Sequence, residues 1–213
     1  MDRRALSERL GRRFARVATD AVMRSPALWR VFRGPIRRQF DRLAPRWETM
    51  RDPQHLAPFE RALEAVDPPP RRALDLGTGT GAGAIAIAKR FPDAEVVGVD
   101  LAERMLAEAS RNVPAELRGR VRFEAADAAA LPHRDGSFDL VGLANMIPFF
   151  DELARVLAPG GQVVFAFSSG PETPIYVPAE RLKAELARRG FGEFQEIEAA
   201  RGSALLARKA DRR

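Results

Sequence analysis

Three carboxylates, Asp75, Asp100 and Asp127, follow short apolar runs of the kind that form β-strands. An acid at the tip of a second strand can accept hydrogen bonds from both hydroxyls of a ribose. An acid after the third strand can accept from the exocyclic amine of an adenine. Three acids at successive strand ends are therefore available for an amino group, a ribose and an adenine.

The glycine-rich run LDLGTGTG at 74–81 comes between the first of these strands and a predicted helix. Glycines let a ligand approach the backbone closely and permit unusual dihedral angles. Their spacing also fits the dinucleotide fingerprint, with Ala82 at its last position. Asp75, two residues before Gly77, would repel a pyrophosphate but attract a cationic amino group. The run therefore favours a ligand with an amino acid moiety over a dinucleotide.

Groups that could move a proton are few, since the chain has two histidines, one tyrosine and no cysteine. His55 lies in the N-terminal segment and is a candidate base or substrate contact. His133 lies in LPHRDG at 131–136 and is interpreted as a loop residue, with acid–base work as the alternative. Neither histidine has neighbours at a metal-ligand spacing, so no metal site is predicted. The lack of cysteine excludes disulfides, thiolate metal sites and a cysteine nucleophile.

Short apolar runs alternate with helical stretches after residue 70. This order predicts an α/β fold with a doubly wound, mostly parallel, seven-stranded sheet, whose ligands bind beyond the carboxyl ends of the strands. Gly202-Ser203 suits a tight turn, so the sheet is expected to end in an antiparallel hairpin. Strands are expected at Arg72–Leu76, Glu95–Val99, Val121–Glu124, Phe138–Ala144, Gln162–Phe167, Phe194–Glu198 and Ala204–Ala207, and helices at Ala82–Arg90, Ala102–Asn112, Phe150–Leu157 and Ala179–Arg189.

Three consecutive prolines, Pro68-Pro69-Pro70, mark a boundary because they cannot lie inside a helix or strand. Before them, apolar residues recur at helical spacing. Further prolines divide this stretch into short pieces, at Pro26, Pro35, Pro45 and Pro53. The expected division is an N-terminal helical cap or lid over residues 1–67 and a ligand-binding core over residues 68–213.

Positive charge is concentrated in the N-terminal third. Residues 1–72 hold 17 arginines and nine acids, whereas residues 73–213 hold 18 basic and 20 acidic residues. A basic segment invites a nucleic-acid or anionic-membrane partner. Because 32 of the 35 basic residues are arginines, a compositional bias of the source is the alternative. The chain has no apolar run of membrane-spanning length and no signal core, so a cytoplasmic protein is expected.

In order and spacing, five pieces resemble the class I S-adenosylmethionine-dependent methyltransferases. They are LDLGTGTG at 74–81, VVGVD at 96–100, AADA at 125–128, LPHRDGSFDLV at 131–141 and ELARVLAPGGQVVF at 152–165. The likeness covers roughly residues 70–209 and implies a Rossmann-like fold with S-adenosyl-L-methionine as cofactor. The upstream piece RRQFDRLAPRWETM at 37–50 resembles the helix that often precedes this core.

The resemblance assigns the parts of the cofactor to residues at the strand ends. Asp100 would hold the ribose, and Leu101 would pack on the adenine. Asp127 would accept from the adenine amine, and Ala128 would donate from its backbone. Five residues would line the methionine end, namely Asp75, Gly77, Thr78, Gly79 and Gly81.

Two further residues would lie near the reacting centre by the same resemblance. Asn145, just after the fourth strand, would be close to the sulfonium and the substrate entrance. Trp47 belongs to the upstream helix, which in related enzymes closes over the cofactor. The catalytic group is left open among His55, His133 and Asn145.

Each of these residues also has a structural alternative. The glycines could be turn residues, and Asp100 could cap the helix that follows it. Asp127 could be a solvated loop acid and Asn145 a turn former, and Trp47 could be core packing.

The resemblance implies an enzyme (EC 2.1.1.-) that moves a methyl group to a small-molecule acceptor by direct displacement, with proximity and orientation as the main catalytic effect. The segment NMIPFF at 145–150 lacks the paired prolines of amino-directed methyltransferases, and its apolar character favours an apolar acceptor. Alternatives are an RNA, protein or membrane-lipid methyltransferase that uses the arginine-rich segment, and a methyltransferase-like protein that binds without catalysis. The acceptor atom and the oligomeric state stay undetermined.

Overall fold

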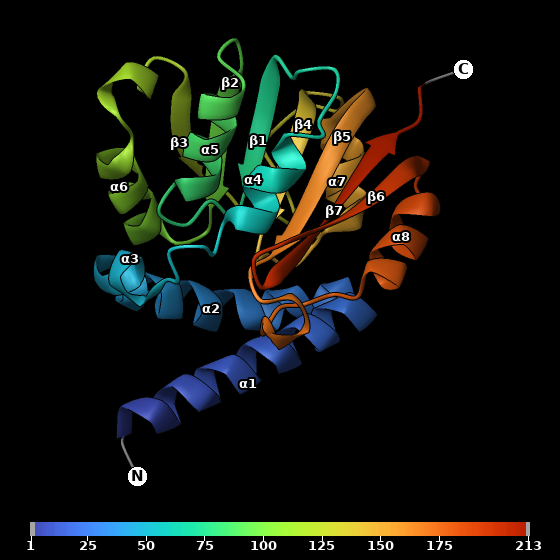
Figure 1. The fold of residues 1–213 in the computed structure, drawn as a ribbon. Coiled ribbons are helices and arrows are strands. Elements are labelled where there is room, and N and C mark those ends of the chain that lie inside the picture. Colours follow the sequence, from blue (N-terminus) through green and yellow to red (C-terminus); the bar gives the residue numbers. More distant parts are fainter. Residues whose placement is uncertain (1–2, 212–213) are drawn as a thin grey trace.

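The computed structural model describes residues 3–211, which form one sheet flanked by helices (Figure 1). The strand order is β3-β2-β1-β4-β5-β7-β6. Strands β1 to β5 pair in parallel, whereas β7 pairs antiparallel with β5 and β6. The predicted α/β fold, with its mostly parallel seven-stranded sheet and terminal hairpin, is therefore confirmed. The bounds are β1 (Arg72–Leu76), β2 (Glu95–Asp100), β3 (Val121–Ala125), β4 (Phe138–Ala144), β5 (Leu157–Phe167), β6 (Phe191–Ala199) and β7 (Gly202–Lys209).

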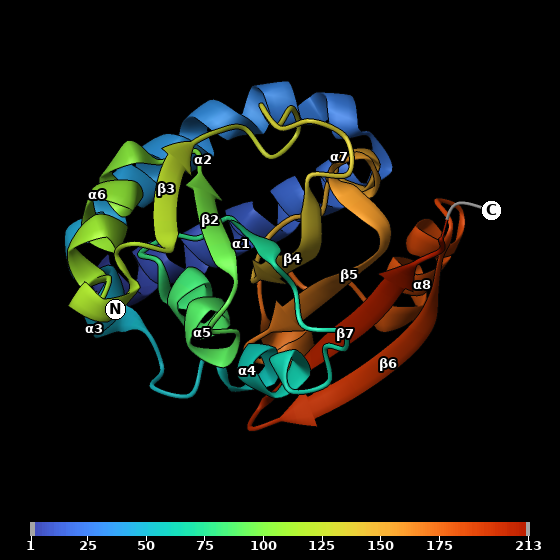
Figure 2. The ribbon, with the colours of Figure 1, turned by 90° about the horizontal axis from the view of Figure 1, so that it is seen from above.

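The helices form three groups around this sheet. One face is covered by α4, α5 and α6, and the other by α7 and α8 (Figure 2). Helices α1 to α3 cross beyond the carboxyl ends of the parallel strands (Figure 1). The bounds are α1 (Arg3–Arg24), α2 (Trp29–Leu43), α3 (Trp47–Met50), α4 (Ala57–Leu63), α5 (Ala82–Arg90), α6 (Glu103–Asn112), α7 (Phe150–Val156) and α8 (Ala179–Ala187).

The central strands β1 and β4 are mainly apolar because both of their faces are buried. Leu74 and Val141 pack with α7 and α8 on one side, whereas Leu140 packs with α4 and α5 on the other. Phe59 of α4 lies so close to β4 that a Cβ added at Gly142 would be 2.5 Å from its Cζ. Helix α4 precedes the three prolines in the chain, but it is part of the core.

Pro35 lies inside α2, so the prediction that it divides the N-terminal stretch is wrong. A proline within a helix removes the hydrogen bond to the carbonyl four residues earlier, here that of Val31. Both Pro35 and Val31 are exposed, so water can satisfy that carbonyl and the helix tolerates the proline.

The turn of the terminal hairpin differs from the prediction. Ala199 pairs with Gly202, and the turn is formed by Ala200 and Arg201, with φ of 52° at Ala200. Gly202 is needed for space instead, because a Cβ at that position would lie 2.3 Å from the carbonyl oxygen of Phe167. The sequence signal of a glycine at the hairpin was correct, but its physical reason is close packing and not the turn.

We call residues 3–50, with α1 to α3, the cap. At one end of the sheet edge, Arg16 of α1 donates to the carbonyl oxygens of Pro171 and Thr173, both at 2.9 Å. At the other end, Asp41 of α2 accepts from the backbone N–H of Arg104 in α6 at 3.1 Å. The cap is therefore attached on both sides of the carboxyl edge. None of the helices within residues 3–211 is long and apolar enough to cross a membrane.

Candidate cofactor site

The chain leaves β1 through a loop with three glycines in the left-handed region. The φ angles are 73° at Gly77, 54° at Gly79 and 89° at Gly81, values that residues with a side chain rarely adopt. The N–H groups of Gly77 and Thr78 both donate to the carbonyl of Val99 at 2.9 Å. This holds the loop, which we call the glycine loop, against the end of β2 at the carboxyl edge of the sheet.

Asp75 lies behind the glycine loop with only 2% of its surface exposed. Thr78 Oγ1 donates to Asp75 Oδ2 at 2.5 Å, and the backbone N–H of Ala84 also donates to this carboxylate. A Cβ at Gly83 would lie 2.6 Å from Oδ1, so glycine lets α5 approach the acid. Burial raises the pKa of Asp75 to about 6, although the two hydrogen bonds and Arg51 counteract it. A positive group placed beside Asp75 would stabilise its ionised form.

Asp100 ends β2 and faces the same loop. Its Oδ2 accepts from the N–H of Gly79 at 2.9 Å, and its Oδ1 accepts from the N–H of Ala102 at 2.8 Å. Burial raises the pKa of Asp100, and these backbone hydrogen bonds oppose that rise. A carboxylate has about four acceptor sites, so Asp100 can stabilise this loop and still accept from a ligand.

Asp127 is held by the cap. Trp29 Nε1 donates to Oδ1 at 2.7 Å, and Arg33 forms an ion pair with Oδ2 at 3.1 Å. The N–H of Ala129 also donates to Oδ1, at 3.0 Å. The Trp29 ring packs edge-on against Phe149, with 5.2 Å between the centroids. The acid that the resemblance assigns to an adenine amine is thus bonded to cap side chains in this conformation.

Another side chain from the N-terminal segment, that of Arg51, reaches the glycine loop itself. Arg51 Nη1 donates to Thr80 Oγ1 at 2.9 Å and lies 3.3 Å from Glu48 Oε1. The Thr80 hydroxyl donates in turn to Glu48. Burial lowers the pKa of Arg51, whereas Glu48 and Asp75 counteract this. Arg51 Nε is buried and has no hydrogen-bond partner among the described residues.

Arg51, Thr80 and Glu48 are site residues that the sequence patterns did not predict. Thr80 lies inside the glycine-rich run and could have been chosen on that ground. The spacing of Glu48 and Arg51 is that of an ordinary ion pair along a helix, and only the fold brings it to the glycine loop.

His55 completes this cluster of polar side chains. Its Nε2 lies 2.6 Å from Arg51 Nη2, and its Nδ1 lies 2.7 Å from the carbonyl oxygen of Asp52. Since Arg51 can only donate, Nε2 is the acceptor and Nδ1 carries the proton. Burial, and then Arg51, lower the pKa of His55. The histidine is therefore neutral, and its basic nitrogen is bonded to Arg51.

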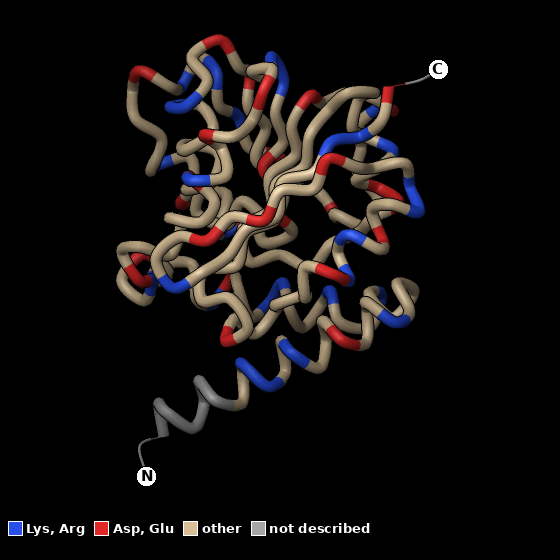
Figure 3. Tube along the Cα trace, turned by 45° about the vertical axis from the view of Figure 1, so that its right-hand side comes forward, with Lys and Arg blue, Asp and Glu red and all other residues tan. Residues whose placement is uncertain are grey.

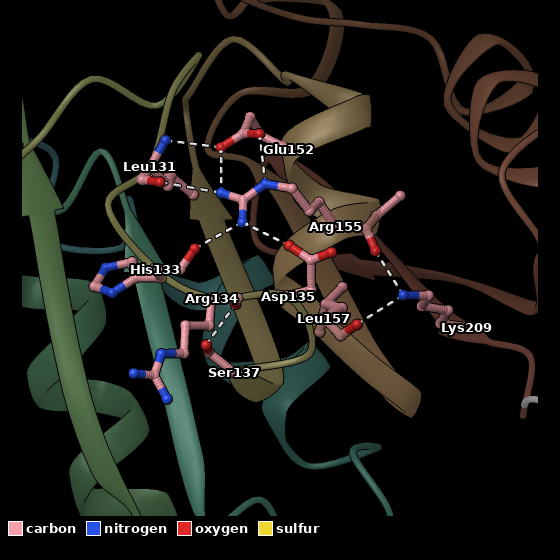
Figure 4. A network of polar contacts seen from close by, with 10 residues as sticks. Leu131, His133, Arg134, Asp135, Ser137, Glu152, Arg155, Leu157 and Lys209 are labelled. Atoms are coloured by element: carbon pink, nitrogen blue, oxygen red, sulfur yellow. Dashed lines mark hydrogen bonds and ion pairs between the residues drawn. The ribbon is translucent and has the colours of Figure 1, made fainter.

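His133 lies apart from the glycine loop. Its ring packs edge-on against Phe138, the first residue of β4, with 5.0 Å between the centroids, whereas the loop follows the carboxyl end of β1. Its carbonyl accepts from Arg155 Nη1 at 2.6 Å, in a network where Arg155 also binds Glu152 and Asp135 (Figure 4). Burial lowers the pKa of His133. The network fixes the connection between β3 and β4.

Asn145 forms the turn after β4. It has a φ of 54°, and its Oδ1 accepts from the N–H of Ser168 at 2.9 Å. The next residue, Met146, lies over the glycine loop, since a Cβ at Gly77 would be 2.7 Å from its Sδ. Asn145 thus joins the ends of β4 and β5 and directs Met146 toward the loop.

The other predicted contacts lie around the same edge. Trp47 Nε1 would be 3.8 Å from a Cβ at Gly79, and its ring packs edge-on against Phe40. Ala128 is buried in the core cluster that includes β1 and β4, and Leu101 packs partly buried against it. Of the predicted residues, all but His133 are therefore arranged around the carboxyl edge or the cap that covers it.

The comparisons with known proteins agree with this geometry. Residues 73–161 match the family model of a methyltransferase domain. With their place in the sheet and their glycine loop, residues 73–161 form a methyltransferase domain of the class I S-adenosylmethionine-dependent type. The structure of an S-adenosylmethionine-dependent methyltransferase from Aquifex aeolicus shares the fold, with a TM-score of 0.65 and 18% identity over 78% of this chain and 97% of that one.

Two relatives are more similar in sequence. The chain is 45% identical over 141 residues to a demethylmenaquinone methyltransferase from Thermus thermophilus, which covers 59% of this chain and 62% of the relative. It is 43% identical over 148 residues to a malonyl-[acyl-carrier protein] O-methyltransferase from Halorhodospira halophila, with 65% of this chain and 49% of the relative covered. The matches thus span about half to two thirds of these relatives' lengths.

The residues present fit S-adenosylmethionine at two of its three parts. The partnerless Nε of Arg51 and the buried acid Asp75 are a cation and an anion beside the glycine loop, which match an amino acid zwitterion. Asp100 retains acceptor capacity for ribose hydroxyls. At the adenine part, Asp127 is bonded to Trp29 and Arg33, so the fit there requires these two side chains to move.

Proposed function

We propose that this protein transfers a methyl group from S-adenosylmethionine to a ring carbon of a reduced quinone. The observation that carries the cofactor part is Arg51 at the glycine loop, a half-buried side chain whose buried Nε has no hydrogen-bond partner among the described residues. The acceptor part rests on the 45% identity to a protein named demethylmenaquinone methyltransferase. The apolar segment after β4, in which Ile147 and Phe149 are buried and Met146 borders the loop, supports an apolar acceptor.

In this proposal the chain binds the cofactor through charges of opposite sign. Arg51 binds the methionine carboxylate through Nε, and Asp75 stabilises the ammonium group. Asp100 accepts from the ribose hydroxyls while it keeps its bonds to the loop. Asp127 accepts from the adenine amine after exchange with Trp29.

The bound cofactor supplies an electron-poor methyl carbon on a sulfonium. A quinol ring carbon is electron-rich, so it can form the new bond while the electron pair of the broken carbon–sulfur bond stays on sulfur. The ring proton then leaves and restores the quinol. The protein's contribution is alignment of acceptor and methyl group, which is worth up to roughly 7–11 kcal/mol.

Trp47 and Met146 lie over the glycine loop and would exclude water from the reacting centre. His55 can accept the ring proton only once Arg51 Nη2 has left its Nε2. In this proposal the cap, residues 3–50, is the lid of the site.

Calorimetry with S-adenosylhomocysteine tests the cofactor part. Replacing Arg51 by Met should weaken binding about 10- to 100-fold, because a charge-assisted hydrogen bond to a buried group is worth roughly 1.5–3 kcal/mol. The matched control is Arg46→Met, which removes the same charge from an exposed residue and should leave affinity unchanged. Equal affinity of both variants, with both folded by circular dichroism, would exclude Arg51 as a ligand.

Mass spectrometry tests the acceptor part. The protein and S-adenosylmethionine are incubated with a dithionite-reduced naphthoquinone that bears a prenyl chain and an unsubstituted ring carbon. A product heavier by one methylene is expected on the ring. Methylation of malonyl-[acyl-carrier protein] instead would replace the acceptor, and cofactor binding without transfer to either would favour a binding protein without catalysis.

A further inference from the structure

Large exposed apolar side chains are confined to one part of the described structure. All five of them lie between residues 10 and 50, with exposed fractions from 40% to 66%, and they are Leu10, Val17, Leu28, Val31 and Met50. Isolated exposed apolar residues need no explanation, but a concentration in one segment marks an interaction surface.

The same segment has a strong excess of positive charge. Residues 10–46 hold ten arginines and two acids. Arg12 and Arg16 donate to backbone carbonyls of residues 171–173, and Arg33 pairs with Asp127. The other seven are exposed and have no ion-pair partner among the described residues: Arg13, Arg24, Arg30, Arg37, Arg38, Arg42 and Arg46.

Aliphatic and basic residues share faces of the two long cap helices. Leu10, Val17 and Arg24 recur every seven residues along α1, and Val31, Arg38 and Arg42 follow seven and four residues apart along α2. Residues three, four or seven apart lie on one face of a helix. Each helix therefore presents exposed aliphatic groups beside guanidinium groups, as interfacial helices do.

The aromatic residues of the cap do not belong to this exposed surface. Trp29 is 5% exposed and bonded to Asp127, Phe14 packs on Phe32 with 6.0 Å between ring centroids, and Phe40 packs on Trp47 at 5.3 Å. Single-stranded nucleic acids bind by stacking their bases on exposed aromatic rings. The exposed large apolar side chains of the cap are aliphatic instead, which suits lipid and not nucleic acid.

The cap is also the outermost layer at the carboxyl edge of the sheet. Helix α1 lies farthest from the sheet, and basic residues recur along it (Figures 1 and 3). A partner bound to the outer side of α1 and α2 would therefore be separated from the candidate cofactor site only by the cap.

We infer that the exposed face of α1 and α2 docks onto an anionic membrane surface, with the arginines on the lipid headgroups and the aliphatic side chains in the headgroup boundary. This inference goes beyond the proposed function, because it concerns where the protein resides and not which reaction it performs. It would bring the site to a lipid-soluble acceptor without a membrane-spanning segment.

Vesicle sedimentation tests the inference without any methyl transfer. The full chain is mixed with phosphatidylcholine vesicles that contain about one third phosphatidylglycerol, at about 0.05 M salt, where headgroup charges attract basic segments. Binding is expected with these vesicles and not with pure phosphatidylcholine. It should weaken at least tenfold at about 0.5 M salt, because screening shortens the reach of the charges.

Three variants distinguish the contributions of cap charge, of apolar contact and of overall charge to vesicle binding. The first, R24Q/R38Q/R42Q, should bind anionic vesicles on the order of tenfold to a hundredfold more weakly. The second, V17S/V31S, should bind severalfold more weakly at unchanged charge. The control, which should bind like the parent chain, replaces three exposed arginines outside the cap: R90Q/R118Q/R134Q.

Three results would overturn the inference. The first is no binding of the parent chain to anionic vesicles, and the second is an equal loss of binding in the control. The third is tighter retention on single-stranded RNA than on vesicles at the same salt, with V17S/V31S unaffected, which would assign the surface to nucleic acid. Thermal unfolding of each variant, monitored by circular dichroism, verifies that it is folded. Cofactor binding measured by calorimetry tests the proposed function separately, whether or not the chain binds vesicles.

Discussion

The fold makes the negative charge of Asp75 costly. Burial raises its pKa from 3.8 to about 6, so the folded protein holds this proton more tightly than the unfolded chain does. The resulting stability is fully present below pH 3.8 and is lost as the pH rises through 6. Two pKa units at 1.36 kcal/mol each give a loss of about 3 kcal/mol at high pH.

Asp75→Asn removes this titration and keeps the shape of the side chain. The free energy of unfolding of the variant minus that of the parent chain should increase by about 2 kcal/mol between pH 4.5 and pH 8, the part of the effect that lies in this range. The difference cancels the titrating groups that do not interact with Asp75, and Asp100, whose charge contributes to the raised pKa of Asp75, is the neighbour that it retains. Its value at a single pH is not informative, because the new amide also changes the hydrogen bonds from Thr78 and Ala84.

Urea unfolding followed by circular dichroism at half-unit pH steps supplies these free energies. Saturating S-adenosylhomocysteine should flatten the pH dependence, because an ammonium beside Asp75 stabilises the carboxylate. Parallel curves for parent and variant without ligand would refute the reasoning, since they would mean that Asp75 ionises equally easily in the folded and unfolded chain.

Two further predictions concern packing and the cap. Gly202→Ala should lower the free energy of unfolding by about 1–3 kcal/mol, because the added Cβ meets the Phe167 carbonyl. The control Gly192→Ala, which has nothing within 4 Å of the added Cβ, should change the free energy of unfolding by less than about 0.5 kcal/mol. Equal urea midpoints for the two variants would contradict this prediction. Trp29→Phe should lower the free energy of unfolding by roughly 1.5–3 kcal/mol, because it removes the hydrogen bond to the Asp127 carboxylate. Trp47→Phe breaks no hydrogen bond among the described residues and should lower it less. The reverse order would show that the bond from Trp29 to Asp127 does not stabilise the cap.

Local patterns were sufficient for the elements of the core. The helix Ala82–Arg90 and the strand Phe138–Ala144 have the bounds that the sequence predicts. Here the periodicity of apolar residues and the adjacent glycines agree with the burial that the fold imposes. The carboxylates Asp75 and Asp100 were found for the same reason, since parallel strands bring their carboxyl ends to one edge.

Contacts across long stretches of chain were not predictable. Trp29 reaches Asp127 over 98 positions, and Arg51 reaches Thr80 over 29. Such contacts depend on how the cap lies over the sheet, which no run of neighbouring residues encodes. Arg51 could not be selected from the sequence, because it lies in an arginine-rich segment where nothing distinguishes it from an exposed arginine such as Arg46.

The position of α4 determines where this chain can be divided. Phe59 and Leu63 are fully buried on the sheet, and Phe59 lies directly on Gly142. A chain that started after the three prolines would leave the centre of one sheet face bare. The exchangeable unit of this architecture is therefore the cap, which could be replaced by another one during evolution or engineering while Arg51, His55 and α4 stay with the catalytic scaffold.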